Sequence, residues 1–130
     1  MTIGLIGCGA KKRSEACRAE DLYTGPVFTS AKKYIKTRVS AWGILSAKHG
    51  LLLPEVFIAP YDVMLTKMKK EERTSWADHV GEELITRWPD ENFLVVAGLP
   101  YRQALEGLPY RAPFAGLTVG RLLQALKEAR

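Results

Sequence analysis

The stretch Trp42–Leu65, WGILSAKHGLLLPEVFIAPYDVML, decides how the rest of the chain is interpreted. Its first residues, Trp42–Leu45, have the short apolar character of a buried strand. A hydroxyl, an ammonium and an imidazole follow directly, at Ser46, Lys48 and His49. A strand needed only for the core has no use for such groups at its carboxyl end, where open α/β sheets bind their ligands. We therefore predict a functional site at the carboxyl end of this strand.

The composition indicates one globular domain. The chain has 130 residues, of which 47% are hydrophobic and 25% are charged, so it can bury a core without disulfide or metal and is not disordered. Lys and Arg outnumber Asp and Glu by 19 to 14, and the net charge of +5 favours an anionic partner, a nucleotide or nucleic acid. With two cysteines, no signal peptide and no apolar run of about 20 residues, we expect a cytoplasmic protein without membrane contact.

Hydrophobic periodicity predicts strands that alternate with helices. The strands are expected at Thr2–Cys8, Ala41–Ser46 and Asn92–Ala97, with a short edge strand or an extended link at Arg111–Gly116. The helices are expected at Pro26–Ser40, from Lys69 or Lys70 to Trp88, at Tyr101–Leu108, and after the N-cap Thr118. The predicted fold is a single three-layer α/β/α domain, residues 1–130, with a short, mostly parallel sheet of about four strands.

Each of the first three predicted strands is followed by a polar segment. The segments are Cys8–Arg13, Ser46–Gly50 and Gly98–Arg102. Because parallel strands end at the same edge of a sheet, we expect the three segments to lie close together. They then form a single site.

The segment Ser46–Gly50 is the strongest functional signal. Lys48 can hold a phosphate or a carboxylate, His49 can move a proton near neutral pH, and Gly50 permits the turn that presents them. The alternative is a solvated turn in which His49 only hydrogen-bonds a carbonyl. Ser46 is included as a substrate-binding candidate.

The residues after the first strand form a second candidate. Gly9 and its small neighbours let backbone amides approach an anion, and Lys12 adds positive charge. The segment has neither the Walker spacing nor GxGxxG, so we predict no loop of either type. Cys8 is a nucleophile or, in the interpretation we favour, a small buried side chain.

Several other residues are candidates with open alternatives. Asp62 with Tyr61 can pair with His49 or activate water, or it can be a turn residue after Pro60. Tyr23 and Thr24 precede a helix and can bind an anion or serve only as a cap.

Gly98 and Arg102 follow the third strand, and Arg102 suits a phosphate. We expect no metal and no cofactor, because Cys8, Cys17, His49 and His79 have poor spacing for zinc.

The motifs of the first 65 to 80 residues resemble a widespread uncharacterised domain family of bacteria and their phages. The resemblance rests on Cys8 with Lys12, on Leu22–Gly25 with Phe28, on Leu45–Leu51 with Pro54, and on Pro60–Asp62 with Leu65. A second likeness is to the lysine-transferring domain of archaeosine synthase, whose motif has Cys and Lys at the spacing of Cys8 and Lys12. That domain is similar to uracil-DNA-glycosylase-like α/β folds, and the likeness implies a nucleobase, nucleoside or nucleic acid as ligand.

Our leading hypothesis is a small enzyme that acts on a nucleobase, nucleoside or nucleotide, free or within nucleic acid, by hydrolysis or transfer at or near the N-glycosidic bond. The catalytic candidates are Lys12, Lys48, His49 and Asp62; the lysines hold negative charge and Asp62 or His49 is the base. The substrate-binding candidates are Cys8, Gly9, Tyr23, Thr24, Ser46, Gly50, Tyr61, Gly98 and Arg102, of which Tyr23 or Tyr61 stacks on the base. The rival is a non-catalytic module that binds nucleotide or nucleic acid through the same lysines.

Overall fold

A five-stranded sheet lies at the centre of the computed structural model, which describes residues 1–130. Its strand order is β4 (Gly50–Leu52), β3 (Ala41–Ser46), β1 (Thr2–Gly7), β6 (Asn92–Val96), β7 (Tyr110–Arg111). All neighbouring strands run parallel except β3 and β4, which form an antiparallel pair. The predicted mixed, mostly parallel α/β sheet is confirmed.

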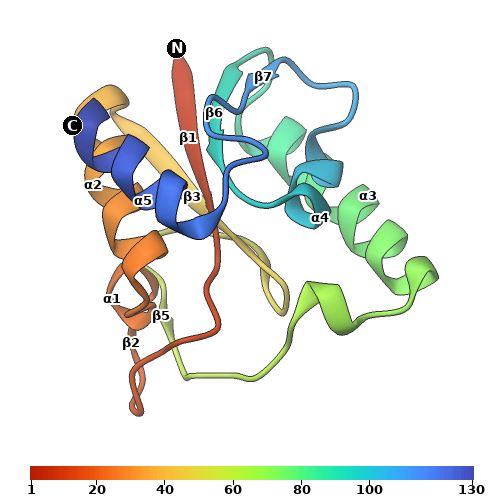
Figure 1. Cartoon of the computed structure of the whole chain (residues 1–130). Helices are drawn as coiled ribbons and strands as arrows, with labels where there is room; N and C mark the ends of the chain where they lie inside the picture. Colours follow the sequence, from red (N-terminus) through yellow and green to blue (C-terminus); the bar gives the residue numbers. More distant parts are fainter.

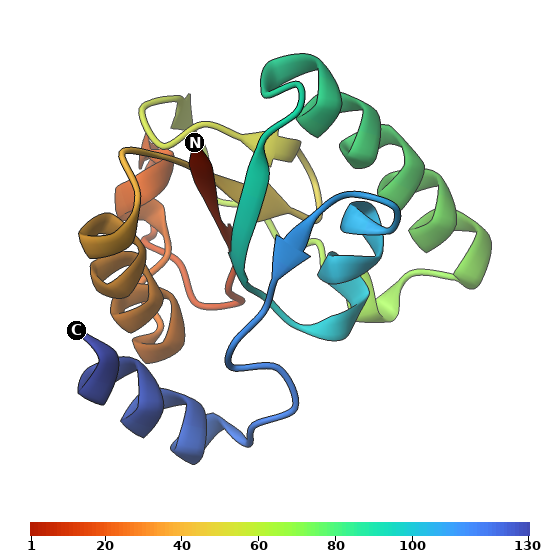
Figure 2. The same cartoon turned by 90° about the horizontal axis from the view of Figure 1, so that it is seen from above.

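Helices cover both faces of the sheet (Figures 1 and 2). The helices on one face are α2 (Pro26–Arg38) and, beside it, α5 (Val119–Ala129). The other face carries α3 (Lys70–Arg87), α4 (Leu99–Arg102) and the short 3₁₀ helix η2 (Gln103–Leu105). This three-layer arrangement is the α/β/α domain that the sequence predicts.

The alternation of side chains along β1 explains the two cores. Ile3 and Leu5 are fully buried in the core under α3, whereas Ile6 belongs to the core under α2 and α5. A fully buried Leu or Ile contributes about 1.5–3 kcal/mol to folding, so both helical layers are held to the sheet mainly by apolar contact. At Gly4 a Cβ would collide with Ile35 of α2, so the small residue allows the helix to pack closely on β1.

Several element boundaries differ from the predictions because long-range pairing overrides the local pattern. The apolar run after Gly50 pairs with β3 as strand β4, so the sheet has five strands rather than about four. The extended link after Leu108 contributes only the two-residue edge strand β7. The helix expected at Tyr101–Leu108 instead begins at Leu99 and is divided between α4 and η2.

The first long connection also differs from the prediction. A helical turn is expected at Ser14–Glu20, but residues Cys17–Arg18 form strand β2 and the turn follows as α1 (Ala19–Leu22). Strand β2 pairs antiparallel with β5 (Phe57–Ile58), a partner about 40 residues away in sequence that no local pattern reveals. A further 3₁₀ turn, η1 (Leu65–Lys67), precedes α3.

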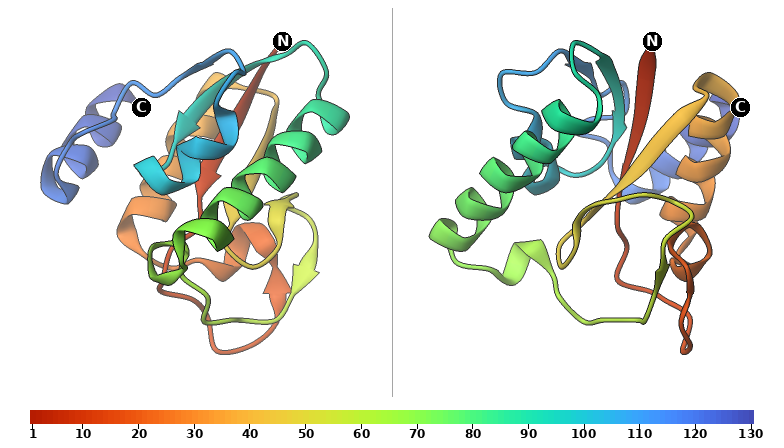
Figure 3. Two further views of the ribbon diagram at one scale, coloured as in Figure 1. Left: turned by 90° about the vertical axis from the view of Figure 1, so that its right-hand side faces the viewer. Right: turned by 180° about the vertical axis from the view of Figure 1, so that it is seen from behind.

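The topology creates a crevice between β1 and β6. The chain leaves β1 toward α2 on one face of the sheet, and it leaves β6 toward α4 on the opposite face. Strand ends at such a switch point are where α/β sheets bind ligands. The long connections that include β2 and β5 cross the same edge (Figure 3). None of the helices has the length and apolar character to span a bilayer.

Candidate functional site

Tyr61 is the centre of a hydrogen-bonded group at the carboxyl ends of β1 and β3. Its hydroxyl lies 2.6 Å from the Tyr23 hydroxyl and 2.7 Å from Oγ of Ser46. Ser46 is fully buried, and its Oγ accepts a hydrogen bond of 3.0 Å from the backbone N–H of His49. We call Lys12, Tyr23, Ser46, Lys48, His49 and Tyr61 the polar cluster. It joins the segments after β1 and β3 to two residues of the long connections.

Two lysines approach the ring of Tyr61. Lys12 Nζ lies 4.4 Å from its centroid and 5.7 Å from that of Tyr23, and Lys48 Nζ lies 6.0 Å from the Tyr61 centroid. The His49 ring stands edge-on to Tyr61, with a centroid separation of 5.3 Å. Neither lysine forms an ion pair with a carboxylate. The two positive charges are therefore available to an anionic ligand.

The protonation states follow from burial. Burial raises the pKa of Tyr23 to about 12 and, together with the nearby Cys8 thiol, raises the pKa of Tyr61 as well. Both phenols are therefore protonated near neutral pH. Among the three linked hydroxyls of Tyr23, Tyr61 and Ser46, one O–H is left to donate a hydrogen bond to a ligand. Partial burial and then the charge of Lys48 lower the pKa of His49 below its ordinary value of 6.5. Its imidazole is neutral at pH 7 and can accept a proton.

The β3–β4 hairpin and α3 hold the polar cluster in place. Gly50 has φ +71°, and a Cβ there would also collide with the Glu83 carboxylate, so the turn requires glycine. Glu83 accepts a hydrogen bond of 3.2 Å from the N–H of Leu51. Trp76 of α3 donates its indole N–H to the carbonyl of Ser46, at 2.9 Å. Helix α3 thus fixes the turn that carries Ser46 and His49.

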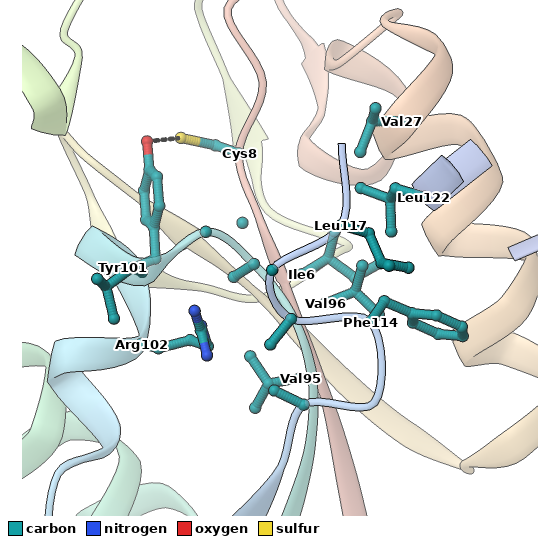
Figure 4. A pocket seen from close by; sticks show the side chains of 17 residues that line it. Ile6, Cys8, Val27, Val95, Val96, Tyr101, Arg102, Phe114, Leu117 and Leu122 are labelled. Carbon is teal, nitrogen blue, oxygen red and sulfur yellow. Dashed lines mark hydrogen bonds between the residues drawn. The ribbon is translucent and has the colours of Figure 1, made fainter. Parts of the chain in front are cut away.

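A cavity of about 480 Å³ lies on the other side of β1, at the ends of β1 and β6. Hydrophobic residues make up 13 of the 17 that line it. One wall is the segment Phe114–Leu117, and Leu122 of α5 and Val27 of α2 complete that side (Figure 4). We call this cavity the apolar pocket. It occupies the crevice that the topology creates.

Cys8 and Tyr101 separate the apolar pocket from the polar cluster. The Cys8 thiol and the Tyr101 hydroxyl are 3.4 Å apart, and both residues line the pocket (Figure 4). The Tyr101 ring packs edge-on against Trp76, which contacts Ser46. Burial, and then Cys8, raise the pKa of Tyr101.

Arg102 of α4 is the charged residue of the apolar pocket, which Gly98 also lines. Figure 4 shows its guanidinium below Tyr101. The Nε atom is buried and has no hydrogen-bond partner in the protein. A buried donor without an acceptor costs about 1–3 kcal/mol, which a ligand with an acceptor would recover.

The remaining predicted site residues lie at the margin. Asp62 is exposed and forms no ion pair, so the structure does not join its carboxylate to His49. Thr24 is exposed and lines a shallow groove between α2 and α5. Gly9 is half-buried, and a Cβ there would meet no atom within 4 Å. The roles predicted for these residues stay predictions.

Sequence reasoning missed the wall formed by Phe114 and Leu117 and the contacts of Trp76 and Tyr101. The signal available was an aromatic and a leucine in a link rich in Gly and Pro, where a plain connection is polar. No group of three or more His, Cys, Asp and Glu side chains lies close enough to hold a metal ion. Both cysteines are free thiols.

Comparison with known proteins places the chain in a family. A family of unknown function (DUF6884) matches residues 3–128. The chain belongs to this family. The uncharacterised protein YfjM of Bacillus subtilis (strain 168) is 31% identical over 144 residues, which cover 96% of this chain and 92% of YfjM. Membership of an uncharacterised bacterial family, predicted from the motifs, is confirmed, and the DUF6884 match includes both the polar cluster and the apolar pocket.

Proposed function

We propose that this DUF6884 protein binds a nucleoside or nucleotide, free or within nucleic acid, and cleaves the bond between base and sugar. The observation that carries the proposal is that Cys8 and Tyr101 line the apolar pocket while Cys8 also lies near Tyr61 of the polar cluster. One half of the site is an apolar pocket, and the other is a polar cluster with two lysines that have no carboxylate partner. A nucleotide has the same division, since its base is flat and weakly hydrated and its phosphate is anionic.

The base fits the apolar pocket. Its volume of about 480 Å³ lies within the range of pockets that enclose small ligands, and its lining is mainly hydrophobic. The phosphate then lies toward Lys12 and Lys48, which have no carboxylate partners. The glycosidic bond lies between the halves, close to the hydroxyl chain of Tyr61.

The polar cluster supplies the groups that hydrolysis needs. Water attacks the anomeric carbon while neutral His49 accepts a proton from it, and the carbon–nitrogen bond breaks with its electron pair leaving on the base. Lys12 and Lys48 hold the phosphate, and the released base loses its negative charge by taking up a proton from solvent. Asp62, next to Tyr61 in the chain, is the alternative proton acceptor.

One observation favours the rival function, a non-catalytic module that binds nucleic acid. A shallow groove between α2 and α5 is lined by Lys33, Lys127 and Arg130, none of which forms an ion pair. Such a surface suits a phosphate backbone. In this alternative the lysines of the site are phosphate contacts and no bond is broken.

The test is an assay for free base. The purified protein is incubated with nucleosides, mononucleotides and short DNA and RNA, and released base is measured by chromatography. The enzyme function predicts release by the wild type, and a loss of about 10²- to 10⁴-fold in the His49→Ala variant. His79→Ala is the matched control, because His79 is exposed on α3 and its only partner is Glu83.

Salt-dependent binding without release of base supports the binding module and contradicts the enzyme. In that case Lys12→Ala and Lys48→Ala reduce the slope of affinity against salt concentration by about one charge each. Absence of both release and binding contradicts both functions.

A further inference from the structure

Arg102 is the charged residue of the site that has a buried donor atom without a partner. Its guanidinium is a donor-only group, and the buried Nε has no acceptor in the protein. The neighbouring lining is hydrophobic and contains no carboxylate. Arg102 is half-buried, and a ligand that offers acceptors to its guanidinium would add hydrogen bonds that the protein does not supply.

The shape of this donor restricts the ligand. Guanidinium presents its N–H groups as a planar fork, which matches two acceptors that lie side by side on one edge of a planar ring. Guanine and hypoxanthine have this edge, formed by O6 and N7. Adenine has N7 beside an amino group, whose N–H would face the N–H of the arginine.

A phosphate is the less suitable partner for Arg102. The apolar lining of the pocket would leave most of its oxygens without donors, whereas Lys12 and Lys48 offer positive charge outside the pocket. A flat base can bury its faces against Val95, Leu117 and Phe114 and present only one edge to the guanidinium. The lining therefore favours a base over an anion at this position.

We propose that Arg102 is the specificity-determining residue of the apolar pocket and selects 6-oxopurines, guanine or hypoxanthine, over adenine. The inference rests on the proposed nucleotide function and identifies the class of base. Its basis is the unpaired donor inside a pocket that is otherwise apolar. It replaces the phosphate-binding role that sequence alone predicts for this residue.

The test compares inosine, guanosine and adenosine 5′-monophosphates by isothermal titration calorimetry. Inosine monophosphate is the critical probe, because it differs from adenosine monophosphate at the edge that Arg102 reads. We expect the two oxo-purine nucleotides to bind at least about tenfold more tightly, as found for bidentate arginine contacts. Arg102→Gln removes this preference, and Arg102→Lys retains charge without the fork and loses most of it.

The matched control is Arg87→Gln, which removes the same charge from an exposed position on α3 away from the pocket. It should leave the preference unchanged. Loss of an unpaired donor should not lower the melting temperature, so an unchanged thermal transition in Arg102→Gln verifies folding.

Equal binding of all three nucleotides by the wild type overturns the Arg102 inference while leaving the proposed function intact. Retention of the oxo-purine preference in Arg102→Gln also overturns it. If no nucleotide binds, both the inference and the nucleotide function are wrong.

Discussion

The two sides of β1 present opposite chemistry at the same edge of the sheet. On the β3 side, the polar cluster has hydroxyls, an imidazole and unpaired ammonium groups. On the β6 side, the apolar pocket is lined by valines, leucines and Phe114 around one guanidinium. Cys8 and Tyr101 lie between them. Under the proposed function, the polar cluster holds the phosphate and carries out the reaction, and the apolar pocket recognises the base.

The largest expected effect concerns the residue of the polar cluster that accepts the proton from water. If His49 accepts the proton, His49→Ala lowers kcat by about 10²- to 10⁴-fold, whereas exposed Asp62→Asn changes it little. The measurement is single-turnover release of base. If Asp62→Asn lowers kcat more than His49→Ala does, Asp62 is the proton acceptor instead of His49.

The next effect concerns the hydrogen-bonded hydroxyls of Tyr23, Ser46 and Tyr61. Tyr61→Phe leaves the hydroxyls of Tyr23 and buried Ser46 without a shared partner, which should lower the free energy of unfolding by about 1–3 kcal/mol. Urea unfolding measures it. Tyr110→Phe, at an exposed position of β7, is the control and should have no such effect. Equal free energies of unfolding for the two variants would show that the three linked hydroxyls do not stabilise the fold.

The apolar half can be changed without touching the polar half. Ala115→Trp places an indole at the wall of the apolar pocket, where Ala115 is exposed and can be enlarged without disturbing the core. We expect nucleotide affinity to fall by at least about tenfold, or 1.4 kcal/mol, because the base is displaced. Titration calorimetry measures it. Unchanged affinity would place the base elsewhere.

The smallest effect is a shift in pH dependence. A neutral His49 is needed, so activity falls as pH decreases through its pKa, which lies below 6.5 because of burial and Lys48. Lys48→Met removes the nearby positive charge, which is the smaller of the two causes that lower the pKa of His49. The pH at which kcat/KM falls to half on the acidic side therefore moves upward, and it stays below 6.5 because burial still lowers the pKa. A Lys127→Met control on α5 leaves it in place. A downward shift in Lys48→Met would contradict the assignment of this limb to His49.

The polar residues after β3 were predictable from sequence because they form a local pattern. Ser46, Lys48 and His49 follow an apolar strand directly, and parallel strands bring their carboxyl ends together. The apolar pocket was not predictable in this way. Phe114, Leu117 and Leu122 look like ordinary apolar residues in the sequence, and only their position opposite β6 makes them a wall.

What the sequence by itself determined is the alternation of the three central strands with the long helices, the parallel core and the polar residues at its edge, because periodicity and turn chemistry are local properties. The tertiary structure alone decided that β2 pairs with β5, that Tyr61 joins Tyr23 to Ser46, and that Arg102 is enclosed without a partner. These features depend on contacts between distant segments. Their energies come from burial and hydrogen bonding after the chain has folded, and no short window of sequence contains them.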